Sequence, residues 1–369
     1  MDLEQVMRTL VVNPGSSSLK LSVVDSGATV ATRTSENWDG APARWPLQDV
    51  LAASGPVDAV GVRIVHGGDR PGPRLLDEDE LRSLEEFVPL APLHQPRSLA
   101  LARMAADLLP GVPVVGCFDT SFHAGMPAHA ATYPVPREWT DGFRLRRYGF
   151  HGLSCAYALR TAAAVLDRPA GELGLICCHI GAGVSVTAIA GGRGVDTSMG
   201  FTPLDGVAMA TRSGGLDPGL LLHVQRAGEL SVEEVEAALN RRSGLAGMSG
   251  TSGDVRQVLA ARAVGDQRAD LAIRVYLHRL RREIAAARVS LDRLDALVLT
   301  GGVAEHEPAL MAELLDGLTH LDLAVAPDAV RGAEDRVISP DGARTRVLVV
   351  EAREDVEIAH QVDAARLAV

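Results

Sequence analysis

The sequence predicts an α/β protein built from two similar halves, and three observations lead to this prediction. The chain has 369 residues, more than one hydrophobic core usually serves, so two domains are expected. Segments typical of strands alternate with segments typical of helices, as in α/β folds. A plan of strand, small-residue turn and strand occurs at 9–24 and recurs at 175–189, which indicates an internal duplication.

The two turns of this plan, at 14–18 and 179–183, are rich in glycine, serine and alanine. Such turns expose backbone N–H groups that can bind a phosphate. The first turn lacks the Gly-Lys-Ser/Thr ending of a P-loop. The second lacks the third glycine of a dinucleotide fingerprint and leads into a strand, not a helix. We therefore expect a duplicated fold that holds a phosphate between its halves.

The remaining elements follow from local signals. Ser231 and Glu234 form the pattern of a capping box, which predicts a helix that stops near Gly244. Pro96 and Pro110 bracket another predicted helix at 97–109. Further helices are expected at 77–87, 265–289 and 355–367, and further strands at 112–117, 294–299 and 346–350.

Composition limits the possible partners and compartment. The net charge of −11 disfavours nucleic-acid binding, which needs a basic face, and the densest basic cluster is only 144–147. The first ten residues lack a signal-peptide pattern, and no apolar run is long enough to span a bilayer. The four cysteines lack metal-ligand spacing and read as buried thiols. We expect a cytoplasmic protein with no nucleic-acid or membrane partner.

Polar residues follow several predicted strands, where open α/β sheets bind their ligands. Arg63 and His66 end one strand-like run, Asp119 follows another, and His151 lies in a glycine-rich segment. Arg212 stands among small residues in the loop at 198–214. Arginine, histidine and backbone N–H groups together suit the transfer of a phosphoryl group. Metal-dependent and serine hydrolases are disfavoured, because no His-x-x-His, Cys-x-x-Cys or Gly-x-Ser-x-Gly pattern is present.

A set of motifs stands in order along nearly the whole chain, at 13–20, 65–68, 92–94, 118–123, 148–152, 179–181, 196–212, 252–256 and 300–302. These motifs resemble those of the acetate kinase family. The resemblance implies a duplicated actin/Hsp70/sugar-kinase-like (ribonuclease H-like) ATPase fold, with two domains around a central cleft. The first domain would comprise 1–150 with the C-terminal helix 355–369. The second, nucleotide-binding and dimerisation domain would comprise 151–354.

The same resemblance implies the reaction. The protein would transfer the γ-phosphoryl group of ATP reversibly to acetate or propionate by direct in-line transfer, giving the acyl phosphate and ADP. Mg²⁺ or Mn²⁺ would be the metal, and the protein would be a homodimer whose other partners are its small carboxylate and nucleotide substrates.

Residue roles also follow from the resemblance, position by position. The catalytic residues would be Arg63, Asp119, His151 and Arg212. The nucleotide phosphates would meet Asn13, Ser16, Ser18, Lys20, His179, Gly181 and Gly183. Adenosine would bind to Asp254, Val255, Arg256, Gly302 and Val303. The acid would bind to Val65, Leu93, His94, Phe150 and Pro203. The metal would be held by Asn13 and Glu354, with the adjacent Asp355 as an alternative.

Four positions depart from the family pattern. Ala182 and His306 stand where the family usually has asparagine, Cys155 where it has histidine, and Gly215 where it has aspartate. Ala182 and His306 motivate a second hypothesis, in which the same site uses pyrophosphate or GTP as the phosphoryl donor. A third hypothesis is a non-catalytic nucleotide sensor, which is disfavoured because the four catalytic positions are all retained.

Overall fold

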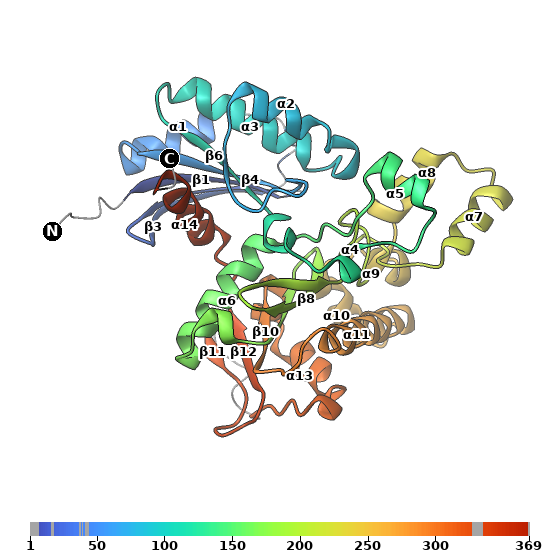
Figure 1. Ribbon diagram of the computed structural model, residues 1–369. Helices are drawn as coiled ribbons and strands as arrows, with labels where there is room; N and C mark the ends of the chain where they lie inside the picture. Colours follow the sequence, from blue (N-terminus) through green and yellow to red (C-terminus); the bar gives the residue numbers. More distant parts are fainter. Residues whose placement is uncertain are drawn as a thin grey trace. The chain divides into compact units, whose positions relative to one another are not determined.

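The computed structural model describes residues 7–15, 18–36, 38, 40, 44–326 and 335–367 (Figure 1). The chain divides into two compact units. Unit 1 comprises the chain up to Gly125, then Phe150–Tyr157 and the chain from Arg353 onward. Unit 2 comprises Met126–Gly149 and Ala158–Ala352. Each unit contains a six-stranded mixed sheet, so the predicted α/β class is confirmed.

The two sheets have the same topology, which confirms the predicted duplication. Unit 1 has the strand order β3-β2-β1-β4-β6-β5, and unit 2 has β9-β8-β7-β10-β12-β11. In each unit the first three strands form an antiparallel meander, and the first strand then pairs in parallel with the fourth in chain order. The short edge strands β5 in unit 1 and β11 in unit 2 run antiparallel to their neighbours β6 and β12.

In unit 1 the strands are β1 (Arg8–Pro14), β2 (Ser18–Asp25), β3 (Ala28–Glu36), β4 (Ala59–Ile64), β5 (Arg74–Leu75) and β6 (Val114–Phe118). Its helices are α1 (Arg44–Ser54), α2 (Glu78–Glu85), α3 (Gln95–Leu108) and α14 (Glu354–Leu367), with 3-10 turns at Val88–Leu90 and Ser121–His123. Alternate strand residues face opposite sides of the sheet. One side packs against α1, α2 and α3, and the other against α14.

In unit 2 the strands are β7 (Leu175–Ile180), β8 (Val184–Ala190), β9 (Arg193–Thr197), β10 (Ala296–Thr300), β11 (Arg336–Val337) and β12 (Arg346–Val350). The helices are α4 (Ala128–Ala131), α5 (Arg137–Phe143), α7 (Pro218–Ala227), α8 (Val232–Arg241), α9 (Gly244–Ser249), α10 (Val255–Ala263), α11 (Gln267–Arg288), α12 (Gly302–His306) and α13 (Pro308–Asp316). Helix α6 (Gly152–Leu166) begins in unit 1 and continues into unit 2, and 3-10 turns lie at Ala170–Glu172 and Thr319–Leu321.

Local sequence signals predicted these elements closely. The capping box of Ser231 and Glu234 is present, with both reciprocal hydrogen bonds formed. The helix that it opens ends at Arg241, and a second helix starts at Gly244. All four cysteines are buried free thiols, as predicted. None of the helices within the described residues is both long and apolar enough to cross a membrane.

Helix α14 returns the end of the chain to the unit 1 sheet, and Gly61 on β4 determines how closely it packs. A Cβ atom at Gly61 would lie 2.4 Å from Cγ2 of Ile358 and 2.9 Å from Cγ2 of Val362. Both side chains are fully buried. Helix α14 can therefore pack this closely against the sheet because residue 61 has no side chain.

We expect Gly61→Ala to destabilise unit 1 by about 1–3 kcal/mol, the usual effect of forcing an extra methyl group into a packed core. The measurement is the midpoint of urea denaturation. Gly72→Ala is the matched control, because a Cβ atom there would meet no atom within 4 Å. Equal midpoints for the two variants would contradict this account of α14 packing.

Candidate active site

Arg63, near the carboxyl end of β4, is the centre of a charged cluster in unit 1. Its Nε donates to Asp119 Oδ1 at 3.1 Å and its Nη2 to Asp119 Oδ2 at 2.8 Å, a bidentate pair. Its Nη1 donates to Asn13 Oδ1 at 3.2 Å and to Glu354 Oε2 at 3.0 Å. One guanidinium thus links residues at the ends of β1 and β4, just beyond β6, and at the start of α14.

This cluster is closed and mostly buried. Asn13 Nδ2 donates to Glu354 Oε2 at 2.8 Å. The side chains of Arg63 and Glu354 are 13% and 11% exposed, and that of Asp119 is 1% exposed. Burial by itself would lower the pKa of Arg63, but the charges of Asp119 and Glu354 outweigh it and raise that pKa. Arg63 therefore presents a fixed positive charge in a poorly hydrated place, where Coulomb interactions are strong.

Asp119 experiences opposing effects. Burial raises the pKa of its carboxyl group, whereas the charge and hydrogen bonds of Arg63 and a hydrogen bond from the backbone of His151 oppose that rise. The two carboxylate oxygens of Asp119 accept two parallel N–H bonds from the guanidinium of Arg63. This bidentate geometry is the strongest form of an arginine–carboxylate pair. Asp119 therefore serves first to orient Arg63.

Two adjacent acidic residues open α14, and the structure separates their environments. Glu354 faces Arg63 and Asn13. Asp355 instead accepts a hydrogen bond from Thr29 Oγ1 at 2.6 Å and pairs with Arg353 at 3.2 Å. Burial would raise the pKa of Asp355, but the hydrogen bonds from Thr29 and Arg353 outweigh it and lower that pKa. Only Glu354 lies in the Arg63 cluster.

The oxygen atoms of Asn13 and Glu354 are donors of the kind that Mg²⁺ prefers. Within the described part of the chain, no group of three or more His, Cys, Asp or Glu side chains could cage a metal. Mg²⁺ usually keeps several waters and takes one or two carboxylates, with substrate phosphates as further ligands. These residues therefore fit a metal that arrives with a nucleotide rather than one held by the protein alone.

His151 lies beside Asp119 in an unusual backbone conformation. Its φ is +59°, in the left-handed region, and it is 9% exposed. The next residue, Gly152, donates its N–H to Asp119 O at 2.8 Å. A Cβ atom at Gly152 would lie 2.3 Å from that same oxygen, so only glycine allows the two backbones to meet. This contact places the predicted histidine next to the Arg63 cluster.

Two of the predicted acid-binding residues of unit 1 adjoin members of this cluster in the chain, since Val65 is two residues after Arg63 and Phe150 directly precedes His151. Val65 and Phe150 are buried, while Leu93 and His94 are half-buried just before α3. Phe150 meets the ring of His66 edge-on, with 5.4 Å between the ring centres.

Gln95 fixes the backbone next to Val65. Its Oε1 accepts from His66 N–H at 3.1 Å, and its Nε2 donates to His66 O at 2.8 Å. This fully buried amide supports the apolar wall, yet the sequence reasoning assigned it no role. The one sequence feature that pointed to such a role is its position directly after His94, in an apolar segment next to Pro96.

In unit 2 the loop before α7 holds Arg212 and Pro203 together. Arg212 Nη1 donates to Pro203 O at 3.2 Å, and the backbone N–H of Met209 donates to Arg212 O at 3.0 Å. The turn after β7 closes through the N–H of Gly181, which donates to Gly183 O at 3.0 Å. His179 lies on β7 just before this turn.

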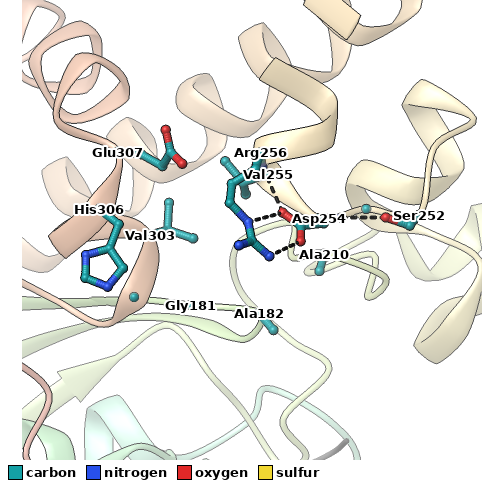
Figure 2. A pocket seen from close by; sticks show the side chains of 12 residues that line it. Gly181, Ala182, Ala210, Ser252, Asp254, Val255, Arg256, Val303, His306 and Glu307 are labelled. Carbon is teal, nitrogen blue, oxygen red and sulfur yellow. Dashed lines mark hydrogen bonds and ion pairs between the residues drawn. The ribbon is translucent and has the colours of Figure 1, made fainter. Parts of the chain in front are cut away.

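A cavity of about 520 Å³ opens in unit 2 between this turn, α10 and α12 (Figure 2). Asp254 caps α10 and accepts two hydrogen bonds from the Arg256 side chain, at 2.6 and 3.1 Å. These bonds lower the pKa of Asp254. The lining residues are Gly181, Ala182, Ala210, Ser252, Gly253, Asp254, Val255, Arg256, Gly302, Val303, His306 and Glu307.

The structure thus brings many of the predicted residues together in two groups, one in each unit, whereas Arg212 and Pro203 bond to each other and are not among the residues that line the unit 2 cavity. Unit 1 gathers Asn13, Arg63, Asp119, His151 and Glu354 by direct contact. Lys20 lies opposite Asn13 in the β1–β2 register, and Ser18 begins β2. Ser16 lies outside the described residues. Unit 2 gathers the predicted adenosine residues around one cavity, together with Ala210 and Glu307, which the sequence reasoning did not identify.

Known proteins are similar to this chain over nearly its whole length. The model of the Acetokinase family matches residues 46–360. An acetate kinase of Synechococcus sp. is 42% identical, with 96% of this chain and 98% of the relative covered. An acetate kinase of Streptomyces coelicolor is 40% identical, with 96% of each covered.

Solved structures agree with this relationship. The acetate kinase of Porphyromonas gingivalis matches with a TM-score of 0.88 and 31% identity, over 98% of this chain and 100% of the other. A propionate kinase from Francisella tularensis matches with the same score and identity, over 96% of this chain and 98% of the other. Sequence and fold therefore place the chain in the Acetokinase family, whose members are phosphotransferases with a carboxyl group as acceptor.

Proposed function

We propose that this protein transfers the γ-phosphoryl group of ATP reversibly to a short carboxylate, acetate or propionate, giving the acyl phosphate and ADP. The buried guanidinium of Arg63, aimed by Asp119 and flanked by Asn13 and Glu354, is the observation that carries the proposal. A fork of this kind binds carboxylate and phosphoryl oxygens and remains charged at any physiological pH.

In the proposed reaction a carboxylate oxygen attacks the γ-phosphorus in line. The new O–P bond forms as the bond to the β,γ-bridging oxygen breaks, and ADP leaves with the bonding electrons. Arg63 and Arg212 hold the carboxylate and the phosphoryl group, and His151 contacts the equatorial oxygens. A loose transition state needs positioning and charge stabilisation, not a protein nucleophile, so no phosphoenzyme forms.

Asn13 and Glu354 would hold Mg²⁺ or Mn²⁺ bound to the nucleotide phosphates. The metal neutralises phosphate charge when bound. Ser16, Ser18, Lys20, His179, Gly181 and Gly183 would hold the phosphates themselves.

The phosphoryl donor is a nucleotide in this proposal because unit 2 offers a cavity of about 520 Å³. Pyrophosphate would leave such a cavity unfilled. Adenosine would lie between Val255 and Arg256 on α10 and Gly302 and Val303 on α12, with Asp254 fixing Arg256. A panel of ATP, GTP and pyrophosphate tests the choice, since Ala182 and His306 line the same cavity.

The acid would meet Val65, Leu93, Phe150 and Pro203, with His94 nearby. An apolar pocket separates homologous acids weakly, because one methylene group is worth only about 1–3 kcal/mol. We therefore expect both acetate and propionate to be substrates. An enzyme that consumes ATP is expected to work in the cytoplasm.

A second copy of this chain is the proposed macromolecular partner. Helices α5, α7 and α8 contain no buried residue among those described, yet they expose large apolar side chains. The exposed residues are Trp139, Phe143, Leu220, Leu222, Val224 and Val232. Apolar exposure of this kind marks interaction sites. We assign these three helices to the interface of a homodimer.

Arg63→Ala and Arg212→Ala should each reduce acyl phosphate formation by about 100-fold or more, because each removes a charge that binds the transferring group. The hydroxamate assay for acyl phosphate measures this. Arg82→Ala is the control, because its side chain on α2 is 63% exposed and lies outside the proposed sites. Retention of more than about a tenth of the activity in either variant would contradict the assignment.

Glu354→Gln should raise the Mg²⁺ concentration needed for half-maximal activity, whereas Asp355→Asn should leave that concentration unchanged and lower the melting temperature. The pKa of Asp355 is lowered in the folded state, so its ionised form stabilises the fold above the unfolded pKa, ~3.9. This contribution is lost as the pH falls through the folded-state pKa. The melting difference should therefore be present at pH 7 and shrink in acid.

Magnesium titrations and thermal melts over this pH range provide the two measurements. A shifted Mg²⁺ titration in Asp355→Asn, with none in Glu354→Gln, would transfer the metal role to Asp355.

Sedimentation equilibrium should show a dimer that dissociates when Leu222 and Val232 are both changed to glutamate. Both side chains are more than half exposed in the single chain, at 52% and 65%. Val289→Glu is the control, because Val289 is 89% exposed but lies just after α11. A monomeric wild-type protein, or a double variant that stays dimeric, would refute this interface.

A further inference from the structure

His123 is a fully buried histidine close to the Arg63 cluster that has no part in the proposed reaction. It ends the short 3-10 helix Ser121–His123, which follows β6 and Asp119. Its Nε2 lies 3.1 Å from the carbonyl oxygen of Phe150. Its Nδ1 has no hydrogen-bond partner within the part of the chain that the structure describes.

These surroundings determine the tautomer of His123. Burial lowers its pKa to about 4, so the imidazole is neutral near pH 7 and carries one N–H. The carbonyl of Phe150 can only accept, so the proton belongs on Nε2. The other tautomer would set two lone pairs against each other at 3.1 Å and place a buried N–H where no described residue offers an acceptor.

The hydrogen bond from His123 to the Phe150 carbonyl matters because of the backbone conformation of the next residue, His151. His151 has a φ of +59°, which is uncommon outside glycine and persists only where its surroundings enforce it. The backbone of residues 150–152 is held by hydrogen bonds from one short segment, 119–123. Asp119 binds the backbone of His151 with its carboxylate and that of Gly152 with its carbonyl oxygen, and His123 binds Phe150.

We propose that His123 is a positioning residue for phosphoryl transfer. Its Nε2–H holds the Phe150 carbonyl, and this keeps the peptide between Phe150 and His151 in the orientation that the left-handed conformation of His151 requires. His123 touches neither substrate nor nucleotide. The inference rests on the proposed roles of Phe150 as acid-pocket wall and His151 as phosphoryl ligand.

Because Phe150 and His151 adjoin the same peptide, its rotation would move both side chains. Loss of the His123 bond should therefore affect two quantities together, the turnover number and the preference between acids. A merely space-filling histidine would affect stability alone. Packing by itself would favour an apolar residue here, because Nδ1 is a buried polar atom to which no described residue bonds.

The experiment compares His123→Leu, which removes the donor, with His123→Gln, whose amide nitrogen can take the place of Nε2. We expect His123→Leu to lower kcat by about 30- to 100-fold, as small misplacements in active sites do. KM for ATP should stay within about twofold, and the ratio of propionate to acetate use should change. His123→Gln should recover most of kcat and the wild-type ratio.

Crystal structures of both variants provide a readout that does not depend on activity. The φ of residue 151 should leave the left-handed region in His123→Leu and keep its value in His123→Gln. An unchanged φ and kcat in His123→Leu would overturn the proposal. Equal loss of kcat in the two folded variants would also overturn it, because the donor would then be irrelevant.

If His123→Leu does not fold, ¹⁵N NMR of the wild-type protein tests the proposal by measuring the tautomer of His123. The His123 signals are assigned as those that disappear in His123→Gln. A neutral Nε2–H tautomer at pH 7 supports the proposal, and an Nδ1–H or charged His123 overturns it. A wild-type protein that forms no acyl phosphate would refute the proposed function instead, and would leave the tautomer and the φ of residue 151 as tests of the backbone contact.

Discussion

The bidentate pair of Arg63 and Asp119 is the interaction on which the rest of the unit 1 site depends. A guanidinium that is 13% exposed is stable only if anions and hydrogen-bond acceptors replace its water. Asp119 occupies two of its N–H groups, and Nη1 remains to organise Asn13 and Glu354. Removal of one partner from a buried pair typically costs about 3–5 kcal/mol, because the other charge is left uncompensated. The cluster is therefore a unit, and a substitution in it affects both chemistry and folding.

The duplicated topology gives the two units the same frame but different chemistry. The strand order in unit 1 is repeated in unit 2, so β4 corresponds to β10 and β1 to β7. In unit 1 the ends of these strands bear Arg63 and Asn13, which form a charged network. In unit 2 the corresponding ends lead into Gly181 and Gly302, which leave open the cavity of about 520 Å³. One copy of the fold thus holds a charged network at its strand ends, and the other holds an open cavity at the corresponding place.

Local signals predicted the fold well, whereas the contacts within the site depend on distant residues. The hairpins, the capping box and the course of α11 all arise from neighbours in sequence. The partners of Arg63 are 50, 56 and 291 positions away, so no local pattern could pair them. The sequence does not distinguish Glu354 from Asp355, and distant contacts separate them. Glu354 meets Arg63 and Asn13, whereas Asp355 meets Thr29 on β3. The sequence suggested no role for Gln95 or His123 for a related reason, since each acts on the backbone of a distant residue.

The glycine next to His151 illustrates a more general constraint. A carboxylate can orient an arginine only if the backbone around the carboxylate is itself fixed, and here the fixing contacts come from the chain at 150–152. Gly152 lets this chain reach Asp119 O, and the left-handed φ of His151 directs the chain from that contact into α6. The small residues that mark the motif in the sequence are therefore explained by close approach rather than by flexibility. The same contact couples the carboxylate that aims Arg63 to the histidine proposed to meet the phosphoryl group, so neither can move alone.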